Sequence, residues 1–274
     1  MIGCPLMCNF CPQDNLRDSY GTQEVKYMPL QTFITAINKI PANTRIDFSG
    51  MAEAWVNPEC TDMLEYALEK GHNVAIYTTL YNWTVDTARR VEKLLHQYRR
   101  QVEVLSVHFP DEYGNMKGWK FSEEWVSVFH IVTNAVQSAG IKLEAMTMSD
   151  HGKIHKDLQF LGVQLYNWFG HDRAGSLNRE QVTEQPINFI EKHEHPVRCS
   201  KTINYDQHVL LPNGDIVLCC MDYNTKHILG NLLTGTYEDL FTGPGMMSLL
   251  RENTKSCYSA SSLCKSCTDA EYYV

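Results

Sequence analysis

The feature that most limits the possible folds is an alternation of helical and strand-like segments between residues 30 and 170. Apolar residues recur at helical spacing in some segments, and short apolar runs between them are typical of buried strands. We expect helices at 30–40, 57–71, 84–98, 122–140 and 155–162, and strands at 45–50, 73–79, 102–109, 142–148 and 163–169. Strands that alternate with helices predict βαβ units, and therefore a parallel sheet covered by helices. The predicted fold is α/β, and five strands indicate a partial, open αβ barrel.

Two of these helices carry more detailed signals. In the helix at 57–71, Asn57 is the expected cap, Pro58 the first helical residue and Gly71 the end. The helix at 84–98 has four apolar residues on one face, which we expect to be buried: Ala88, Val91, Leu94 and Leu95.

Every unusual polar cluster in this region follows the end of a predicted strand. The clusters read SGMAEAW, TTLYN, HFPDEYG, SDHG and GHDRAG in the order of the chain. In parallel αβ folds the loops at the carboxyl ends of the strands carry the functional groups. We therefore expect one functional face, formed by these loops.

Composition excludes several classes of function. The 274 residues carry a net charge of −8 without a basic run, which disfavours a nucleic-acid binder. No apolar stretch is long enough to span a membrane, and no charged-then-apolar leader precedes the first cysteine. We therefore expect a soluble protein of the reducing cytoplasm. There, ten cysteines are better explained as metal ligands than as disulfides.

Three of these cysteines form a motif near the start of the chain, C-x-x-x-C-x-x-C, at Cys4, Cys8 and Cys11. Iron–sulfur clusters usually take four cysteines, so a three-cysteine site leaves one iron open for chemistry. A structural zinc site would be closed by a fourth cysteine or histidine, and no histidine lies near Cys11. The motif predicts an iron–sulfur site with one open position.

With Phe10 beside its last cysteine, the motif resembles that of the radical S-adenosylmethionine (SAM) enzymes. The resemblance implies a 4Fe–4S cluster at Cys4, Cys8 and Cys11 whose open iron binds SAM, with Phe10 near the adenine. It also implies a 5′-deoxyadenosyl radical that abstracts hydrogen from a substrate, and an electron donor such as flavodoxin or ferredoxin. Only Met1–Gly3 precede the motif. The first barrel strand is therefore expected to be short or missing, unless the chain is truncated.

The segment FSGMAEAWVNPE is similar to the loop with which this family binds the SAM amino group. The resemblance assigns backbone approach to Gly50 and the carboxylate to Glu53. Ala52 and Ala54 depart from the family pattern, which commonly has glycine and proline there. Alone, Glu53 would be interpreted as a solvated loop acid.

Three further residues are assigned to SAM by the same resemblance. SVHFPD is similar to the strand segment that often offers a polar group to the SAM ribose, so Ser106 and His108 are candidates. GHDRAG places Arg173 where it could contact the SAM carboxylate or ribose, since arginine pairs well with carboxylates. The alternatives are a structural histidine and an exposed loop arginine.

A second cysteine group lies in the tail, after the linker predicted at 178–198. A hairpin with its turn at Asn213-Gly214 is followed by Cys219, and LCKSC supplies a C-x-x-C pair. The expected ligands are Cys199, Cys219, Cys264 and Cys267. Cys220 is interpreted as a bystander, because adjacent strand residues face opposite sides. Cys257 is also interpreted as a bystander. The same four thiolates could instead build a zinc knuckle.

This tail, 199–274, resembles the auxiliary iron–sulfur domain of radical SAM enzymes in its short form, called twitch, behind a barrel domain at 1–177. The predicted cofactors are thus a SAM-binding 4Fe–4S cluster, SAM, and one auxiliary 4Fe–4S cluster. The longer form, SPASM, carries two auxiliary clusters and needs about seven cysteines.

A fully ligated auxiliary cluster suits electron transfer, so we expect an oxidoreductase. Hydrogen abstraction from a small sugar-like or aminocyclitol alcohol would be followed by proton loss to a base, for which His171, Asp172 and Tyr166 are candidates. A peptide-modifying maturase, a redox-neutral enzyme and a non-catalytic zinc or iron–sulfur scaffold are the alternatives.

Overall fold

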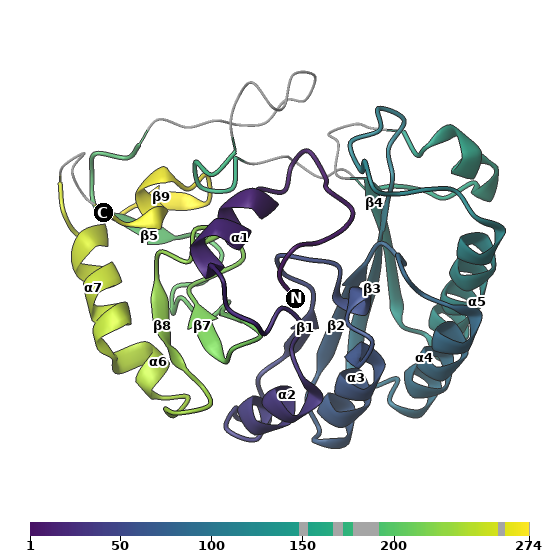
Figure 1. Cartoon of the computed structure of the whole chain (residues 1–274), viewed down its shortest axis with the longest axis horizontal. Coiled ribbons are helices and arrows are strands. Elements are labelled where there is room, and N and C mark those ends of the chain that lie inside the picture. Colours follow the sequence, from purple (N-terminus) through teal and green to yellow (C-terminus); the bar gives the residue numbers. More distant parts are fainter. Residues whose placement is uncertain (148–152, 167–171, 178–191, 257–260, 274) are drawn as a thin grey trace. The chain divides into compact units, whose positions relative to one another are not determined.

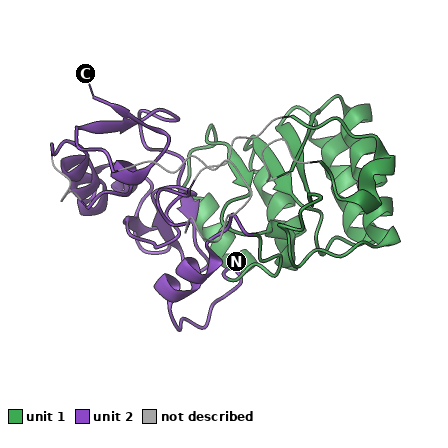
Figure 2. Ribbon diagram, turned by 90° about the horizontal axis from the view of Figure 1, so that it is seen from above, with its two compact units in different colours: residues 1, 3–8, 29–168 green, residues 2, 9–28, 169–274 purple. Residues whose placement is uncertain are grey.

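The computed structural model of the chain describes residues 1–147, 153–166, 172–177, 192–256 and 261–273. These residues form two compact units, which Figure 2 shows in different colours. Unit 1 contains residues 1, 3–8 and 29–168, and unit 2 contains residues 2, 9–28 and 169–274. The segment 9–28 thus packs with the tail. Most of the predicted linker lies outside the described residues.

Unit 1 is built on a parallel sheet, as predicted. Its described strands follow the order of the chain: β1 (Ile46–Phe48), β2 (Val74–Thr78), β3 (Val102–Phe109) and β4 (Lys142–Thr147). The sheet is open, because β1 and β4 are its two edges and do not pair with each other. The predicted fold class, an open partial barrel of parallel strands, is confirmed.

Helices cover one side of this sheet, where α3, α4 and α5 lie next to one another (Figure 1). The helices of unit 1 are α2 (Leu30–Ile37), η1 (Ala54–Val56), α3 (Cys60–Glu69), α4 (Val85–Gln97), α5 (Glu123–Ala139) and η2 (Lys156–Leu161). All four apolar residues predicted to be buried in α4 are buried. Thr84 caps this helix, since its hydroxyl accepts a hydrogen bond from the amide of Thr87 (3.1 Å).

Two predictions about elements were wrong. Helix α3 begins at Cys60 and not at Pro58, although the Asn57 side chain accepts from the amide of Glu59 (3.0 Å), as a cap would, in the turn before the helix. The segment 163–169 is not a strand in its described part, 163–166. There one backbone hydrogen bond to β4 is formed, from Tyr166 N to Ala145 O (3.0 Å), and one such bond does not build a ladder.

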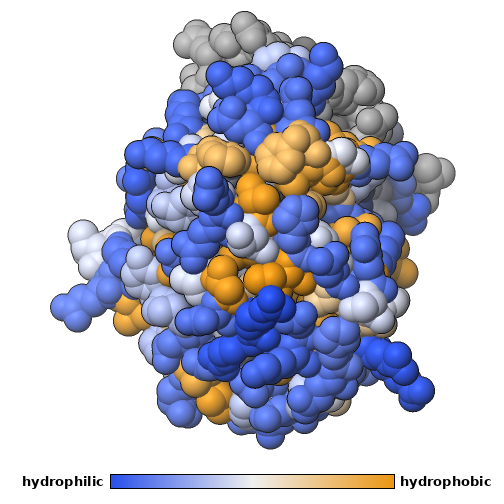
Figure 3. Space-filling model, turned by 90° about the vertical axis from the view of Figure 1, so that its right-hand side faces the viewer, coloured by the Kyte–Doolittle hydropathy of each residue, from blue (hydrophilic) through white to orange (hydrophobic). Residues whose placement is uncertain are grey.

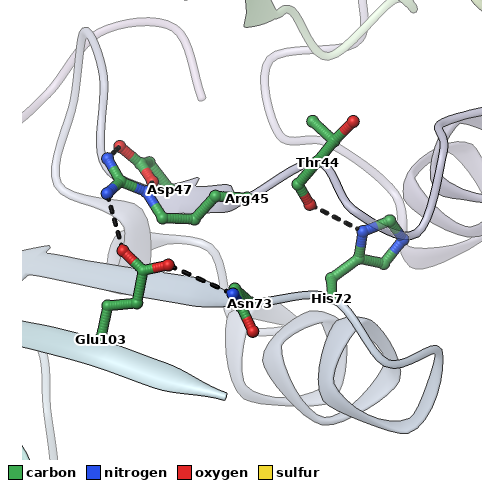
Figure 4. A network of polar contacts seen from close by, with 6 residues as sticks. All are labelled: Thr44, Arg45, Asp47, His72, Asn73 and Glu103. Atoms are coloured by element: carbon green, nitrogen blue, oxygen red, sulfur yellow. Dashed lines mark hydrogen bonds and ion pairs between the residues drawn. The ribbon is translucent and has the colours of Figure 1, made fainter.

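Charged side chains join the amino-terminal ends of three strands (Figure 4). Arg45 donates to both carboxylate oxygens of Asp47 (2.7 and 3.0 Å) and to Glu103 Oε2 (2.9 Å). Asn73 donates to the other oxygen of Glu103 (3.3 Å). Functional loops lie at the opposite ends of parallel strands, so this network belongs to the structural end of the sheet.

Unit 2 contains short elements around the predicted hairpin. They are α1 (Gln13–Tyr20), β5 (Val197–Cys199), β6 (Val209–Leu210), β7 (Asp215–Val217), β8 (Ile228–Asn231), α6 (Asp239–Thr242), α7 (Pro244–Asn253), η4 (Leu263–Ser266) and β9 (Ala270–Tyr272). Strands β6, β7 and β8 form an antiparallel sheet, and β5 pairs with β9. Gly214 has φ +86° in the β6–β7 turn, a conformation that favours glycine.

The helical side of unit 1 presents a mostly hydrophilic surface, on which hydrophobic side chains gather in small areas (Figure 3). Among the described residues, none of the helices combines the length and apolar character needed to cross a bilayer.

Candidate active site

The first two cysteines of the motif lie in unit 1, in a loop that contacts the loop after β3. Cys8 forms an isolated antiparallel bridge with Met116. Between the two cysteines, the carbonyl of Leu6 accepts a hydrogen bond from the amide of Gly118 (2.8 Å). Both cysteines are half-buried. Backbone contacts therefore hold this part of the cysteine loop.

Cys11 lies in unit 2, where two polar groups reach its sulfur. Gln13 Nε2 donates to Cys11 Sγ (3.1 Å), and the hydroxyl of Tyr223 lies 3.2 Å from the same sulfur. Burial, and then the charge of Cys11, raise the pKa of Tyr223, so the phenol keeps its proton and can donate. A sulfur that accepts two hydrogen bonds is suited to be a thiolate ligand, so the surroundings of Cys11 fit the predicted cluster.

Phe10 and Arg173 meet in unit 2, beside Tyr223. Arg173 Nε donates to the carbonyl of Phe10 (3.3 Å), and the guanidinium lies 5.9 Å from the centre of the Tyr223 ring. Phe10 is buried. Arg173 and Ala174 have φ values of +52° and +53°, which are uncommon for residues with a side chain. Backbone strain of this kind is concentrated at functional sites, which supports a binding role for this turn.

Gly50 and Glu53 lie in the loop between β1 and α3 and differ in exposure. Gly50 has φ +109° and an exposed backbone, so a ligand can approach it closely. Glu53, in contrast, is buried, with 5% of its surface exposed. Its interpretation as a solvated loop acid is therefore wrong.

The carboxylate of Glu53 joins this loop to the end of β2. One oxygen accepts from Thr78 Oγ1 (2.8 Å) and Trp55 N (3.3 Å), and the other from the amide and hydroxyl of Thr79 (both 2.7 Å). Burial raises the pKa of Glu53, while these donors act in the opposite direction. A carboxylate has about four acceptor positions, so the chain itself occupies the whole capacity of Glu53.

Polar side chains gather on the face of the sheet that the helices leave free. Phe109 packs on aromatic rings of α5, and side chains alternate along a strand, so Ser106 and His108 face the other side. Tyr77 of β2 and Glu144 of β4 flank Ser106 in the register of the sheet. The rings of Tyr77 and His108 lie 6.2 Å apart. The structure thus brings both predicted ribose-binding residues to one polar face.

The three candidate bases have different surroundings. Burial raises the pKa of Tyr166, and the charge of the neighbouring Glu144 adds to this rise. Tyr166 therefore lies beside the polar face of unit 1. Asp172 is buried in unit 2, with 2% of its surface exposed. His171 lies outside the described residues.

The four cysteines predicted to hold the auxiliary cluster line one cavity of about 60 Å³ in unit 2. These are Cys199, Cys219, Cys264 and Cys267, and Cys220 lines the same cavity. Burial raises the pKa of Cys267 to about 12 and also raises the pKa of Cys219 and Cys264. Cys257 lies outside the described residues.

Either a zinc ion or an iron–sulfur cluster could use these four thiols. Around zinc, with bonds of about 2.3 Å, four tetrahedral sulfurs lie roughly 3.8 Å apart. Within the described parts of the chain, no three Cys, His, Asp or Glu side chains converge closely enough to hold a single metal ion. Four thiols around one cavity are the number that a 4Fe–4S cluster needs, and the same number could hold zinc.

A buried lysine fixes the segment between the last two cysteines. Lys265 has 0% of its surface exposed, and its ammonium group donates to the carbonyls of His195 (2.5 Å) and Lys255 (2.6 Å). This lysine therefore joins η4 to two other segments of unit 2.

Several residues at these sites were not predicted from the sequence. Four of them contact or flank candidate residues in the structure: Gln13, Tyr77, Glu144 and Tyr223. Gly118 contacts Leu6, between Cys4 and Cys8. Gln13 could have been found from its position two residues after Cys11. The others depend on contacts across long stretches of chain.

Comparisons with known proteins bear on the fold and on the cysteine-rich tail. Residues 199–268 match the SPASM family, an iron–sulfur cluster-binding domain. The whole chain is similar to a crystal structure of BtrN in complex with AdoMet and 2-DOIA, with a TM-score of 0.59, 16% identity, and coverage of 97% of this chain and 89% of that one. The chain has the fold of radical SAM enzymes.

A second radical SAM structure, anSMEcpe with bound AdoMet, is similar with a TM-score of 0.53 and 13% identity, over 93% of this chain and 78% of that one. Another, of anSMEcpe with AdoMet and the Kp18Cys peptide, has a TM-score of 0.52 and 12% identity, over 93% and 81%. No curated protein matches the chain. The predicted resemblance to radical SAM enzymes with an auxiliary iron–sulfur domain is confirmed, and the match of residues 199–268 supports an iron–sulfur cluster in that domain.

Proposed function

We propose that the protein is a radical SAM oxidoreductase that removes hydrogen from a small, polar, sugar-like or aminocyclitol alcohol. The observation that carries this proposal is the cavity lined by Cys199, Cys219, Cys264 and Cys267. Four thiolates close every position of an auxiliary cluster, which suits it to accept an electron. A site that takes up an electron favours net oxidation of the substrate, from alcohol to ketone.

In this proposal, different residues bind the first cluster and SAM. Cys4, Cys8 and Cys11 hold the first cluster. When bound, SAM and the two clusters supply a 5′-deoxyadenosyl radical and an acceptor for the remaining electron. The backbone at Gly50 approaches the SAM amino group, and the other SAM-binding residues are Phe10, Ser106, His108 and Arg173. The carboxylate of Glu53, also predicted for SAM, instead fixes the loop through Thr78 and Thr79.

The polar face of unit 1 supports a hydroxylated substrate. Tyr77, Ser106 and Glu144 lie in one row across three strands, and such groups can hydrogen-bond to hydroxyl or ammonium groups. The predicted candidates for the base that takes the carbinol hydroxyl proton are Tyr166, Asp172 and His171. The raised pKa of Tyr166 keeps its phenol protonated, which favours Asp172 or His171 as the base. The similarity to BtrN, solved with the small molecule 2-DOIA, supports the same substrate class.

A peptide-modifying activity is the second candidate. It is favoured by the similarity to anSMEcpe, whose structure contains the Kp18Cys peptide. In both cases we propose a cytoplasmic enzyme that takes its first electron from a donor such as flavodoxin or ferredoxin.

An anaerobic activity assay separates these possibilities. The reduced protein would be incubated with SAM and either a panel of aminocyclitols and sugars or a panel of short peptides, and 5′-deoxyadenosine would be measured. We expect 5′-deoxyadenosine together with a small-molecule product that has lost two hydrogens. A modified peptide would favour the second candidate. Absence of 5′-deoxyadenosine with every substrate and with SAM alone would refute the radical mechanism.

A further inference from the structure

The loop that follows β3, residues 111–119, is fixed at both ends within unit 1. The buried carboxylate of Asp111 accepts from the amide (3.0 Å) and the side chain (2.7 Å) of Asn115. Asp111 also forms an isolated bridge with Ile154. At the other end, the ring of Trp119 lies 6.3 Å from that of Trp125 in α5. A loop held in this way can serve as a rigid support.

This support touches the cysteine loop at two successive points. The amide of Gly118 donates to the carbonyl of Leu6 (2.8 Å), and Met116 pairs with Cys8. Leu6 is itself buried, with 2% of its surface exposed. The backbone between Cys4 and Cys8 is therefore held from one side by residues 116–118.

Gly118 is required here because of space and not because of its backbone angles. Its φ lies outside the left-handed region, so any residue could adopt its conformation. A Cβ atom at this position, however, would lie 2.1 Å from the carbonyl oxygen of Pro5 and 2.8 Å from the Cα of Leu6. Both are backbone atoms, so a side chain at 118 would have to displace the peptide between the first two cysteines.

We propose that Gly118 is a positioning residue for the SAM-binding cluster, because its close contact with Pro5 and Leu6 sets the path of the chain from Cys4 to Cys8. This inference rests on the proposed function in so far as it assigns a cluster to these cysteines. The position of the two thiolates is then determined by a loop more than a hundred residues away in the sequence.

The test is the variant Gly118→Ala, reconstituted anaerobically with iron and sulfide. Two 4Fe–4S clusters correspond to about eight irons per chain in the unchanged protein. In the variant we expect about four irons, with loss of the EPR signal that responds to SAM and retention of the auxiliary signal. The retained auxiliary cluster and the far-ultraviolet circular dichroism spectrum show that the variant has folded.

Two control variants test whether the effect is specific. Lys117→Ala changes an exposed neighbour in the same loop and should keep both clusters. Gly245→Ala creates a similar backbone clash in unit 2, where a Cβ would lie 2.5 Å from the carbonyl oxygen of Ile228, and should keep the SAM-responsive signal. A loss of that signal in Gly245→Ala equal to the loss in Gly118→Ala would overturn the proposal.

A second readout does not depend on the cluster. In cluster-free protein, the rates of maleimide labelling at Cys4 and Cys8 would be measured by mass spectrometry. We expect labelling about tenfold faster in Gly118→Ala than in the unchanged protein, because the support no longer holds the loop. Equal labelling rates together with eight irons in both proteins would refute the positioning role. Faster labelling in a protein that never binds the first cluster would uphold it and refute the proposed function instead.

Discussion

At the scale of single residues, the contact between Tyr223 and Cys11 joins distant parts of the sequence. The two residues are 212 positions apart, and the hydroxyl of Tyr223 lies 3.2 Å from the sulfur of Cys11. If Cys11 is a thiolate ligand it has no proton to give, so the tyrosine must donate. Hydrogen bonds to cluster sulfurs are one of the means by which proteins set reduction potentials. A residue of the auxiliary domain thus contacts a ligand predicted for the other cluster.

Replacement of Tyr223 by Phe should lower the midpoint potential of the first cluster. A hydrogen bond to the thiolate stabilises the more negative, reduced state, and its loss is expected to shift the potential by about 20–60 mV. An EPR-monitored redox titration measures this shift. Tyr273→Phe, at an exposed position, is the matched control. An unchanged potential in Tyr223→Phe would show that the contact does not act on the cluster.

Replacement of Glu53 by Ala should destabilise unit 1 by about 3 kcal/mol, because the buried amide of Thr79 would lose its acceptor. Fluorescence is a suitable probe of denaturant unfolding, since Trp55 and Trp83 pack against each other at this loop, with ring centres 4.5 Å apart. Glu112→Ala, which removes an exposed acid, should have little effect. If Glu53 stabilised the protein only by binding SAM, the Glu53→Ala and Glu112→Ala variants would have equal free energies of unfolding in the absence of SAM.

At the scale of the secondary-structure elements, the two ends of the parallel sheet have different roles. The carboxyl ends carry the Glu53 contacts, whereas the amino ends carry the network of Arg45, Asp47 and Glu103. The network joins β1 to the start of β3, so it stabilises strand pairing without contact with the candidate site.

Replacement of Arg45 by Ala should therefore affect stability slightly and SAM cleavage not at all. Arg45 and its partners are about 40% exposed, so solvent screens the ion pairs, and we expect a loss of about 0.5–1 kcal/mol that shrinks in high salt. Thermal denaturation at low and high salt measures this loss. Lys93→Ala on the exposed face of α4 is the control. A loss that does not depend on salt would contradict the electrostatic explanation.

The elements also differ in how well the sequence predicts them. Helix α4 could be predicted because its apolar face is a local, periodic signal. The strand predicted at 163–169 is wrong in its described part, 163–166, because an apolar run in the sequence shows neither its partner strand nor its hydrogen bonds. Gly118 and Tyr223 could not be found at all, since their partners Pro5 and Cys11 lie far away in the sequence. The cysteine spacings, by contrast, required no knowledge of packing.

At the scale of the whole molecule, the two cysteine sets should be separable. A variant with serine at Cys264 and Cys267 is expected to keep about four irons and the SAM-responsive EPR signal, because its first motif is intact. A variant with alanine at Cys4, Cys8 and Cys11 should keep the other four irons and lose the response to SAM. Zinc in place of iron in the second variant would make the tail a structural zinc site.

The buried ammonium group of Lys265 can report on local opening of the segment between Cys264 and Cys267. Its two carbonyl partners shield it, so an acylating reagent can reach it only when the segment between Cys264 and Cys267 opens. The rate of acylation of Lys265 would therefore measure how often that segment opens locally. The ratio of the acylation rates without and with bound metal would show how strongly the metal suppresses this opening in the intact protein.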